Sequence, residues 1–135
     1  MIVVDSNVLA YLYLPGEFTD EAERLLEADS DWHVPILWRS EFRNILAGYL
    51  RRGVLSFDRA CAIQREAEEL LNGGEHEADS MRVLELVRAS DCSAYDCEFA
   101  AVAQALGATL VTMDTKLLKA FPRIARSLVE DGRRR

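Results

Sequence analysis

Four acidic side chains occur at positions of this sequence that are expected to face inward: Asp5, Glu41, Asp96 and Asp114. The first ends the apolar run of residues 1–4 and the last ends the run 110–113, whereas the other two fall within the apolar stripes of two helical patterns. Charged carboxylates repel one another and resist burial. A divalent cation neutralises such charges, so the set indicates a metal site assembled from distant parts of the chain.

Three of these acids also have an ordinary structural explanation. Asp5 and Asp114 each follow a strand and could cap the next helix, although the Ser-Asn pair after Asp5 offers the same capping chemistry. Ser93 and Asp96 match the Ser/Thr-x-x-Asp/Glu capping pattern. Glu98 falls on the other side of this helix, where we expect it to be solvated. Capping explains each of these three positions singly. It does not explain the joint order of the four acids, which occur after a first strand, on a helix, at a helix start and after a second strand.

Glu41 has a different alternative. It lies within the apolar stripe of a helix expected over residues 35–52, between apolar neighbours four residues away on either side. A buried ion pair, for which Arg52 is a candidate, would explain it, and so would a role in function. Buried ion pairs contribute little to stability, and the sequence leaves both explanations open.

Strands and helices alternate along the chain, and they must position the four acids. Apolar runs predict strands near residues 2–5, 32–34, 109–113 and 127–129. Helical spacing and capping residues predict helices at 8–12, from about 20, and at 35–52, 56–71, 80–88, 94–106 and 116–121. Alternation of this kind predicts a parallel sheet covered by helices on both faces. Ligands of such sheets bind at the carboxyl ends of the strands, where Asp5 and Asp114 are both expected.

The composition is typical of one cytoplasmic domain. Half of the 135 residues are hydrophobic, and no apolar run approaches the roughly 20 residues that a membrane span needs. Three cysteines without a C-x-x-C pair agree with a reducing compartment, and His33 and His76 complete no zinc-ligand spacing. The net charge of −7 argues against a broad electrostatic contact with nucleic acid, but not against a nuclease whose acids bind metal.

Four short stretches match a known sequence pattern. They are Val4-Asp5-Ser6-Asn7-Val8-Leu9, Arg39-Ser40-Glu41-Phe42, Ser93-Ala94-Tyr95-Asp96-Cys97 and Ala108-Thr109-Leu110-Val111-Thr112-Met113-Asp114. With them, the chain resembles the PIN-domain ribonucleases found as VapC-type toxins in bacterial toxin–antitoxin pairs. The resemblance extends from Met1 to about Val129, and no expected acid is missing.

The resemblance implies an α/β fold, namely a PIN-like three-layer α/β/α sandwich whose central, mainly parallel sheet has about four to five strands. It places the PIN domain at residues 1–130 and leaves a basic tail, 131–135, that we expect to be disordered. It further implies a homodimer that cleaves single-stranded or structured RNA with one or two Mg²⁺ or Mn²⁺ ions, and a cognate antitoxin that blocks the site.

The expected activity is metal-dependent hydrolysis of RNA phosphodiester bonds. We expect Asp5 and Asp96 to hold the principal ion and Glu41 and Asp114 to complete the cluster. Three polar residues are candidates to orient these carboxylates: Ser6, Asn7 and Thr112. Five basic residues could contact phosphates, although a solvated helix face is the commoner explanation of such residues: Arg39, Arg43, Arg51, Arg52 and Lys116.

Other functions agree with parts of the sequence. A haloacid-dehalogenase-type phosphatase would need an Asp where Asn7 stands, and a phospho-receiver domain would have no role for Glu41. A non-catalytic PIN-like module that binds metal or a partner, and a housekeeping RNA-processing nuclease, both remain open alternatives.

Overall fold

The computed structural model describes residues 1–129, so the predicted basic tail 131–135 lies outside the described residues. Its elements in chain order are β1 (Ile2–Val4), α1 (Ser6–Tyr13), α2 (Thr19–Ala28), β2 (Trp32–Pro35), α3 (Trp38–Arg51), α4 (Phe57–Leu70), β3 (Glu75–His76), α5 (Ser80–Arg88), α6 (Ala94–Leu106), β4 (Thr109–Thr112), α7 (Thr115–Ala120) and β5 (Ala125–Ser127). Among them, no helix is long and apolar enough to cross a membrane.

The five strands form one parallel sheet in the order β3-β2-β1-β4-β5, which confirms the predicted α/β class. The chain first builds outward from β1 to one edge and then returns to add β4 on the other side of β1. This reversal creates a switch point between β1 and β4, the usual place for a ligand in such sheets. Val4 pairs with Val111, so Asp5 leaves β1 beside Thr112.

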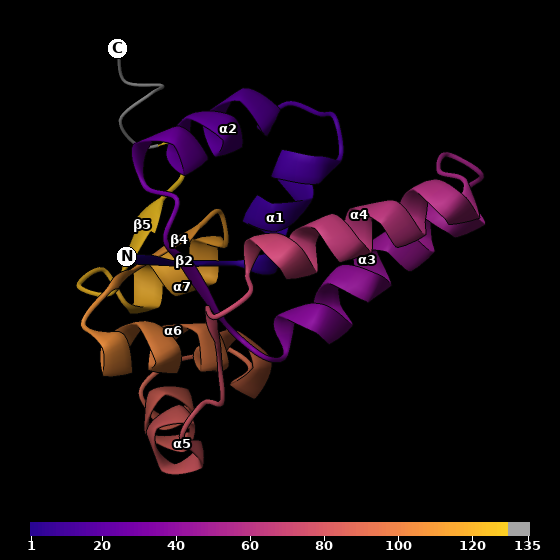
Figure 1. The fold of residues 1–135 in the computed structure, drawn as a ribbon. Coiled ribbons are helices and arrows are strands. Elements are labelled where there is room, and N and C mark those ends of the chain that lie inside the picture. The colour runs from indigo at the N-terminus through magenta and orange to yellow at the C-terminus, as the bar shows by residue number, and fades with distance from the viewer. Residues whose placement is uncertain (130–135) are drawn as a thin grey trace.

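Helices cover both faces of the sheet, as expected (Figure 1). Helix α6 packs against β1, β2 and β4, with α5 on its outer side, whereas α1 and α2 lie across the sheet from them. Helices α3 and α4 form a hairpin that projects from the body of the molecule. The core includes Val3, Val111, Trp38 and Phe42, all fully buried, so the two aromatic residues stabilise the base of the hairpin.

The strands differ from the predicted ones in three places: one strand was missed and two strand boundaries were wrong. The strand β3 was not predicted, because its two residues follow a Gly-Gly pair that marks only a helix end in the sequence. Gly74 is needed there, since a Cβ atom at this position would collide with the carbonyl oxygen of Trp32. Pro35 closes β2 instead of opening α3, which is possible because the N–H groups of Val34 and Ile36 donate to the β3 side and none is needed from Pro35. The last strand spans Ala125–Ser127 and not residues 127–129.

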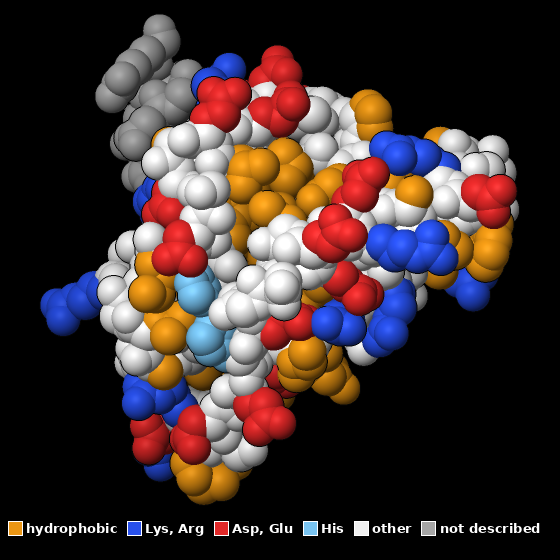
Figure 2. Space-filling model, viewed as in Figure 1, with side chains coloured by type: hydrophobic (Ala, Val, Ile, Leu, Met, Phe, Trp, Pro, Cys, Tyr) orange, Lys and Arg blue, Asp and Glu red, His pale blue; other side chains and the backbone are white. Residues whose placement is uncertain are grey.

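The pairing of β2 with β3 brings the two histidines into contact. His33 Nδ1 lies 2.8 Å from His76 Nε2, and Asp31 Oδ1 lies 2.8 Å from His33 Nε2. Figure 2 shows the two rings side by side at the surface. Burial and the neighbouring His33 lower the pKa of His76. The rings therefore connect the two strands, a contact that their separation in the sequence did not indicate.

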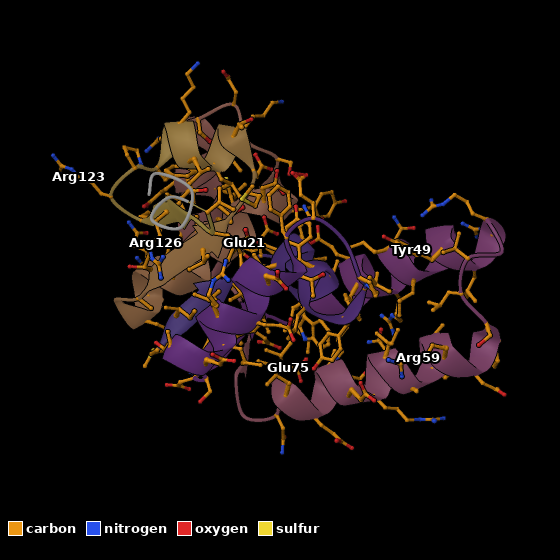
Figure 3. All side chains as sticks on the ribbon, turned by 90° about the horizontal axis from the view of Figure 1, so that it is seen from above. Glu21, Tyr49, Arg59, Glu75, Arg123 and Arg126 are labelled. Carbon is orange, nitrogen blue, oxygen red and sulfur yellow. The ribbon has the colours of Figure 1, made fainter. Side chains whose placement is uncertain are left out.

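An ion pair attaches α3 to the edge strand β3. Trp38 Nε1 donates to Glu75 Oε2 at 2.6 Å, and Arg39 donates at 2.7 Å to both oxygens of the same carboxylate. Figure 3 shows Glu75 at the inner end of the α3–α4 hairpin, with Tyr49 and Arg59 farther out. Arg39 keeps a side chain that is 38% exposed, but its guanidinium is held by Glu75, a partner that neither explanation from the sequence included.

Replacing Glu75 with alanine is expected to lower the free energy of unfolding by about 1–2 kcal/mol, because it leaves Trp38 and Arg39 without their acceptor. The value is modest because the side chains of Glu75 and Arg39 remain 18% and 38% exposed. Urea denaturation measures it. The control is Glu77→Ala, which removes the same charge from an exposed neighbour; equal losses in both variants would contradict a specific role for the pair.

Candidate active site

Asp5 lies at the switch point and is held on both oxygens. It is the N-cap of α1, and its Oδ1 accepts a hydrogen bond from the Ser6 N–H at 2.7 Å. The hydroxyl of Thr112 donates to Oδ2 at 2.6 Å. Asp5 itself is therefore the cap, which is one of the explanations that the sequence left open, and Ser6 and Asn7 are not. With only 6% of its surface exposed, the carboxylate is fixed in one orientation.

Two further acids also combine capping with a place at this site. Asp114 caps α7, where its Oδ1 accepts from the N–H groups of Lys116 and Leu117 at 2.8 and 3.3 Å. Ser93 caps α6 by accepting from the Asp96 N–H at 3.1 Å, so the serine half of the predicted capping pattern is present. Because these bonds use backbone groups or a single carboxylate oxygen, capping and a role in the site are compatible.

Glu41 lies in the first turn of α3 and points toward the start of α1. Its Oε1 accepts a hydrogen bond from the hydroxyl of Ser6 at 2.9 Å. The predicted ion pair with Arg52 is not the explanation for its position, because the Arg52 guanidinium lies over the ring of Tyr49, 4.7 Å from its centre. Ser6 thus connects α1 to α3 and orients one oxygen of Glu41.

One cavity of about 230 Å³ contains all four acids. Its lining residues are Asp5, Ser6, Asn7, Glu41, Asn44, Ile45, Asp96 and Asp114. Thr112 lies behind this surface, fully buried, and reaches the cavity only through Asp5. Asn44 and Ile45 were missed as lining residues. They follow Glu41 by three and four positions on the same helix, so a helical wheel centred on that acid could have found them.

Burial and mutual repulsion disfavour the charged forms of three acids. Burial raises the pKa of Asp5, and the charges of Asp96 and Asp114 add to the rise, against the lowering effect of hydrogen bonds from Thr112 and Ser6. The pKa of Asp96 is raised by burial and by Asp114. Burial also raises the pKa of Glu41, with further contributions from Asp5 and Asp96.

Glu98 differs from its predicted solvated state. It is only partly exposed, and burial raises its pKa. Its charge also contributes to the raised pKa of Glu41. The negative potential of the cavity therefore extends to this fifth acid, although Glu98 does not line the cavity.

Comparison with known proteins identifies the family of this fold. A family model described as "PIN domain" matches residues 2–126. The chain belongs to the PIN-domain family. It is 31% identical over 124 residues to "Ribonuclease VapC3" of Pyrobaculum aerophilum, a match that covers 90% of this chain and 95% of that protein.

Solved structures show the same fold at low sequence identity. FitAcB from Neisseria gonorrhoeae superimposes with a TM-score of 0.76 at 17% identity, covering 96% of this chain and 99% of that one. A toxin–antitoxin complex from Klebsiella pneumoniae contains a chain with a TM-score of 0.66 at 17% identity, with coverage of 95% and 98%. The predicted PIN-like α/β/α sandwich is confirmed.

The carboxylates of this PIN domain fit a hard cation by their chemistry. All four offer oxygen ligands of the kind that Mg²⁺ and Mn²⁺ prefer, and a cation would relieve the repulsion described above. Within residues 1–129, no three His, Cys, Asp or Glu side chains are grouped so that they could hold a metal ion together. Mg²⁺ keeps several waters and needs only one or two protein carboxylates, so this arrangement suits a hydrated ion.

Thr112 is the residue that fixes the two strand-end acids of the PIN domain to each other, because its oxygen also accepts from the Asp114 N–H at 2.9 Å. Replacing it with valine is expected to cost about 1–3 kcal/mol of stability, since one buried and one partly buried hydrogen bond are lost. The RNA cleavage expected from the sequence should also fall about tenfold or more, because Asp5 would lose its fixed orientation. The same change at the exposed Thr109 of β4 is the control. Equal effects in urea denaturation would contradict the assignment.

Proposed function

We propose that this PIN domain is a metal-dependent endoribonuclease that hydrolyses phosphodiester bonds of single-stranded RNA. The observation on which the proposal rests is that carboxylates from the ends of β1 and β4 and from the first turns of α3 and α6 line one cavity. The likeness to a protein named a ribonuclease, at 31% identity over most of both chains, supports the same activity.

The residues of the site would have two roles: four carboxylates hold the ions or the attacking water, and two hydroxyls orient those carboxylates. Asp5 and Asp96 would hold the principal Mg²⁺ or Mn²⁺ ion, and Glu41 and Asp114 would orient the attacking water or hold a second ion. When bound, such ions supply an activated water, charge relief at phosphorus and stabilisation of the leaving oxygen. Two hydroxyls fix the oxygens of this set, Thr112 at Asp5 and Ser6 at Glu41.

The cellular role that we propose is that of a toxin in a toxin–antitoxin pair. One solved structure of the same fold is part of a toxin–antitoxin complex, and the relative at 31% identity carries the name VapC3. In this role, the chain would form a homodimer in the cytoplasm and be held inactive by a cognate antitoxin that covers the acidic cavity. Expression of the wild type alone should then arrest bacterial growth, whereas expression of Asp96→Asn should not.

The activity is tested on purified protein with a panel of single-stranded RNA, structured RNA and single-stranded DNA. We expect RNA cleavage in Mg²⁺ or Mn²⁺ that disappears in chelator and in Asp96→Asn, and that persists in Glu85→Gln, which removes an exposed charge from α5. Binding of RNA and metal without cleavage of any substrate would instead indicate a non-catalytic module. Cleavage without growth arrest would indicate a housekeeping nuclease.

A further inference from the structure

Both lysines of this chain line a second cavity next to the acidic one. The sequence contains 16 basic residues, and the only lysines among them are Lys116 and Lys119. They lie three residues apart on α7 and face a cavity of about 380 Å³, whose opposite wall is formed by residues 89–92 between α5 and α6. Nothing in the sequence indicated that the two side chains share a cavity.

The two cavities adjoin each other at the starts of α6 and α7. Asp114 lines the acidic cavity, and Lys116, two residues later, lines the second one. Asp96 on α6 lines the acidic cavity, and Cys92, four residues earlier and just before that helix, lines the second one. The charge of Lys116 opposes the rise in the pKa of both Asp96 and Cys92. A molecule bound across these helix starts would therefore contact carboxylates on one side and ammonium groups on the other.

The two lysines would offset the electrostatic repulsion between the acidic cavity and the phosphates of an RNA substrate. The chain has a net charge of −7, and the four carboxylates repel phosphates. Of the other basic candidates for phosphate contacts, Arg39 pairs with Glu75 and Glu68, and Arg52 lies over the ring of Tyr49 at the far end of α3. Arg43 donates to Ser40.

The two ammonium groups are available for a ligand. In the described part of the chain, neither lysine side chain forms an ion pair or a hydrogen bond. Asp91, on the opposite wall, adds one negative charge, so the lining of the cavity as a whole keeps a net positive charge. Residues three apart on a helix have Cβ atoms about 5–6 Å apart, so both amines can reach one strand of nucleic acid.

We propose that Lys116 and Lys119 bind the RNA backbone on one side of the cleaved bond, so that the strand runs from the acidic cavity across the start of α7 into the lysine-lined cavity. Lysine is well suited to this contact, because it meets a phosphate as a point charge without demanding one geometry. This inference rests on the proposed ribonuclease activity. It adds the path that the bound RNA strand follows away from the cleaved bond.

Chemical footprinting tests the contact without turnover. The Asp5→Asn protein in Mg²⁺ is acetylated on its amines with and without a single-stranded RNA, and the modified sites are quantified by mass spectrometry. We expect RNA to slow acetylation of Lys116 and Lys119 about fivefold or more. The Met1 amine is an internal control, because it lies at the amino end of β1, paired with Asp29. RNA binding detected by fluorescence anisotropy without lysine protection would overturn the inference.

Kinetics of the double variant Lys116→Gln/Lys119→Gln test the consequence. We expect KM for RNA to rise about tenfold, more than kcat falls, and the slope of log affinity against log salt to decrease by about 1.4, the value for two lost contacts to a single strand. The control Arg24→Gln/Arg123→Gln removes the same charge from exposed positions, and Figure 3 shows Arg123 pointing away from the molecule.

The outcomes separate this inference from the proposed function. If the wild type cleaves RNA and the lysine variant matches the arginine control in KM and salt dependence, the lysine contact is wrong and the ribonuclease proposal stands. If the wild type neither binds nor cleaves any RNA of the panel, both are wrong.

Discussion

Replacing Asp5 with asparagine is expected to lower RNA cleavage by about 100-fold or more, while the protein stays folded. The oxygen of asparagine can still accept from the Ser6 N–H and cap α1, and its amide can donate to the hydroxyl oxygen of Thr112. What is lost is the negative charge at the switch point of the sheet. The substitution is therefore expected to weaken ion binding and to leave the fold intact.

The same change should leave the metal-free protein at least as stable as the wild type at pH 7. Burial raises the pKa of Asp5, which means that the charged form destabilises the fold at neutral pH, and asparagine carries no charge. Thermal unfolding in chelator measures this. Asp20→Asn, at an exposed position on α2, is the control for both readouts. A folded Asp5→Asn protein that cleaves RNA at the wild-type rate would remove Asp5 from the proposed mechanism.

The parts of the fold that the sequence predicted are those with a strong local signal. The strands β1 and β4 are short apolar runs that end in an acid, and α6 ends at Gly107 in a left-handed conformation with a φ of 64°. Two such strands in a parallel sheet must end at the same edge, which is why the amino-acid pattern alone predicted that Asp5 and Asp114 lie together. The switch point itself follows from strand order, which local patterns do not determine.

What the sequence could not predict depends on contacts between distant residues. β3 has only two residues, and its existence depends on the approach of Gly74 to Trp32, more than forty positions earlier. The partner of Arg39 is Glu75, on that unpredicted strand, so the arginine was assigned to solvent or phosphate. The lysine-lined cavity likewise requires the α5–α6 connection to lie against α7.

Capping was weighed against function for three of the acids in the sequence, and the structure shows that capping a helix does not keep an acid out of the cavity. Asp5 and Asp114 cap helices, yet both line the acidic cavity. A strand that ends at a helix start presents both the helix N–H groups and the sheet edge at one point. An acid there can accept a hydrogen bond from the helix while its carboxylate still lines the cavity.

Mn²⁺ is expected to stabilise the protein strongly at pH 7 and much less near pH 4.5. In the metal-free protein, Asp5, Glu41 and Asp96 have raised pKa values, so the folded state binds more protons than the unfolded state above the ordinary carboxyl pKa of about 4. Their contribution to stability is fully present below that pKa and is lost as the pH rises through the raised values. Only the deprotonated carboxylates bind the ion. At neutral pH, ion binding therefore restores the stability that deprotonation of these acids removes.

The size and origin of this effect can be measured by urea denaturation across pH, with Mn²⁺ and with chelator. At about 100 times its Kd, the ion should add about 2.7 kcal/mol to the free energy of unfolding. Comparing the two conditions at each pH cancels the contributions that groups remote from the site make to stability. Glu75 is one such group, and its lowered pKa gives the opposite pH dependence. The double variant Asp5→Asn/Asp96→Asn should lose the increment at every pH. An increment that is equal at pH 4.5 and 7, or that survives in the double variant, would place the ion somewhere other than the four-carboxylate cavity.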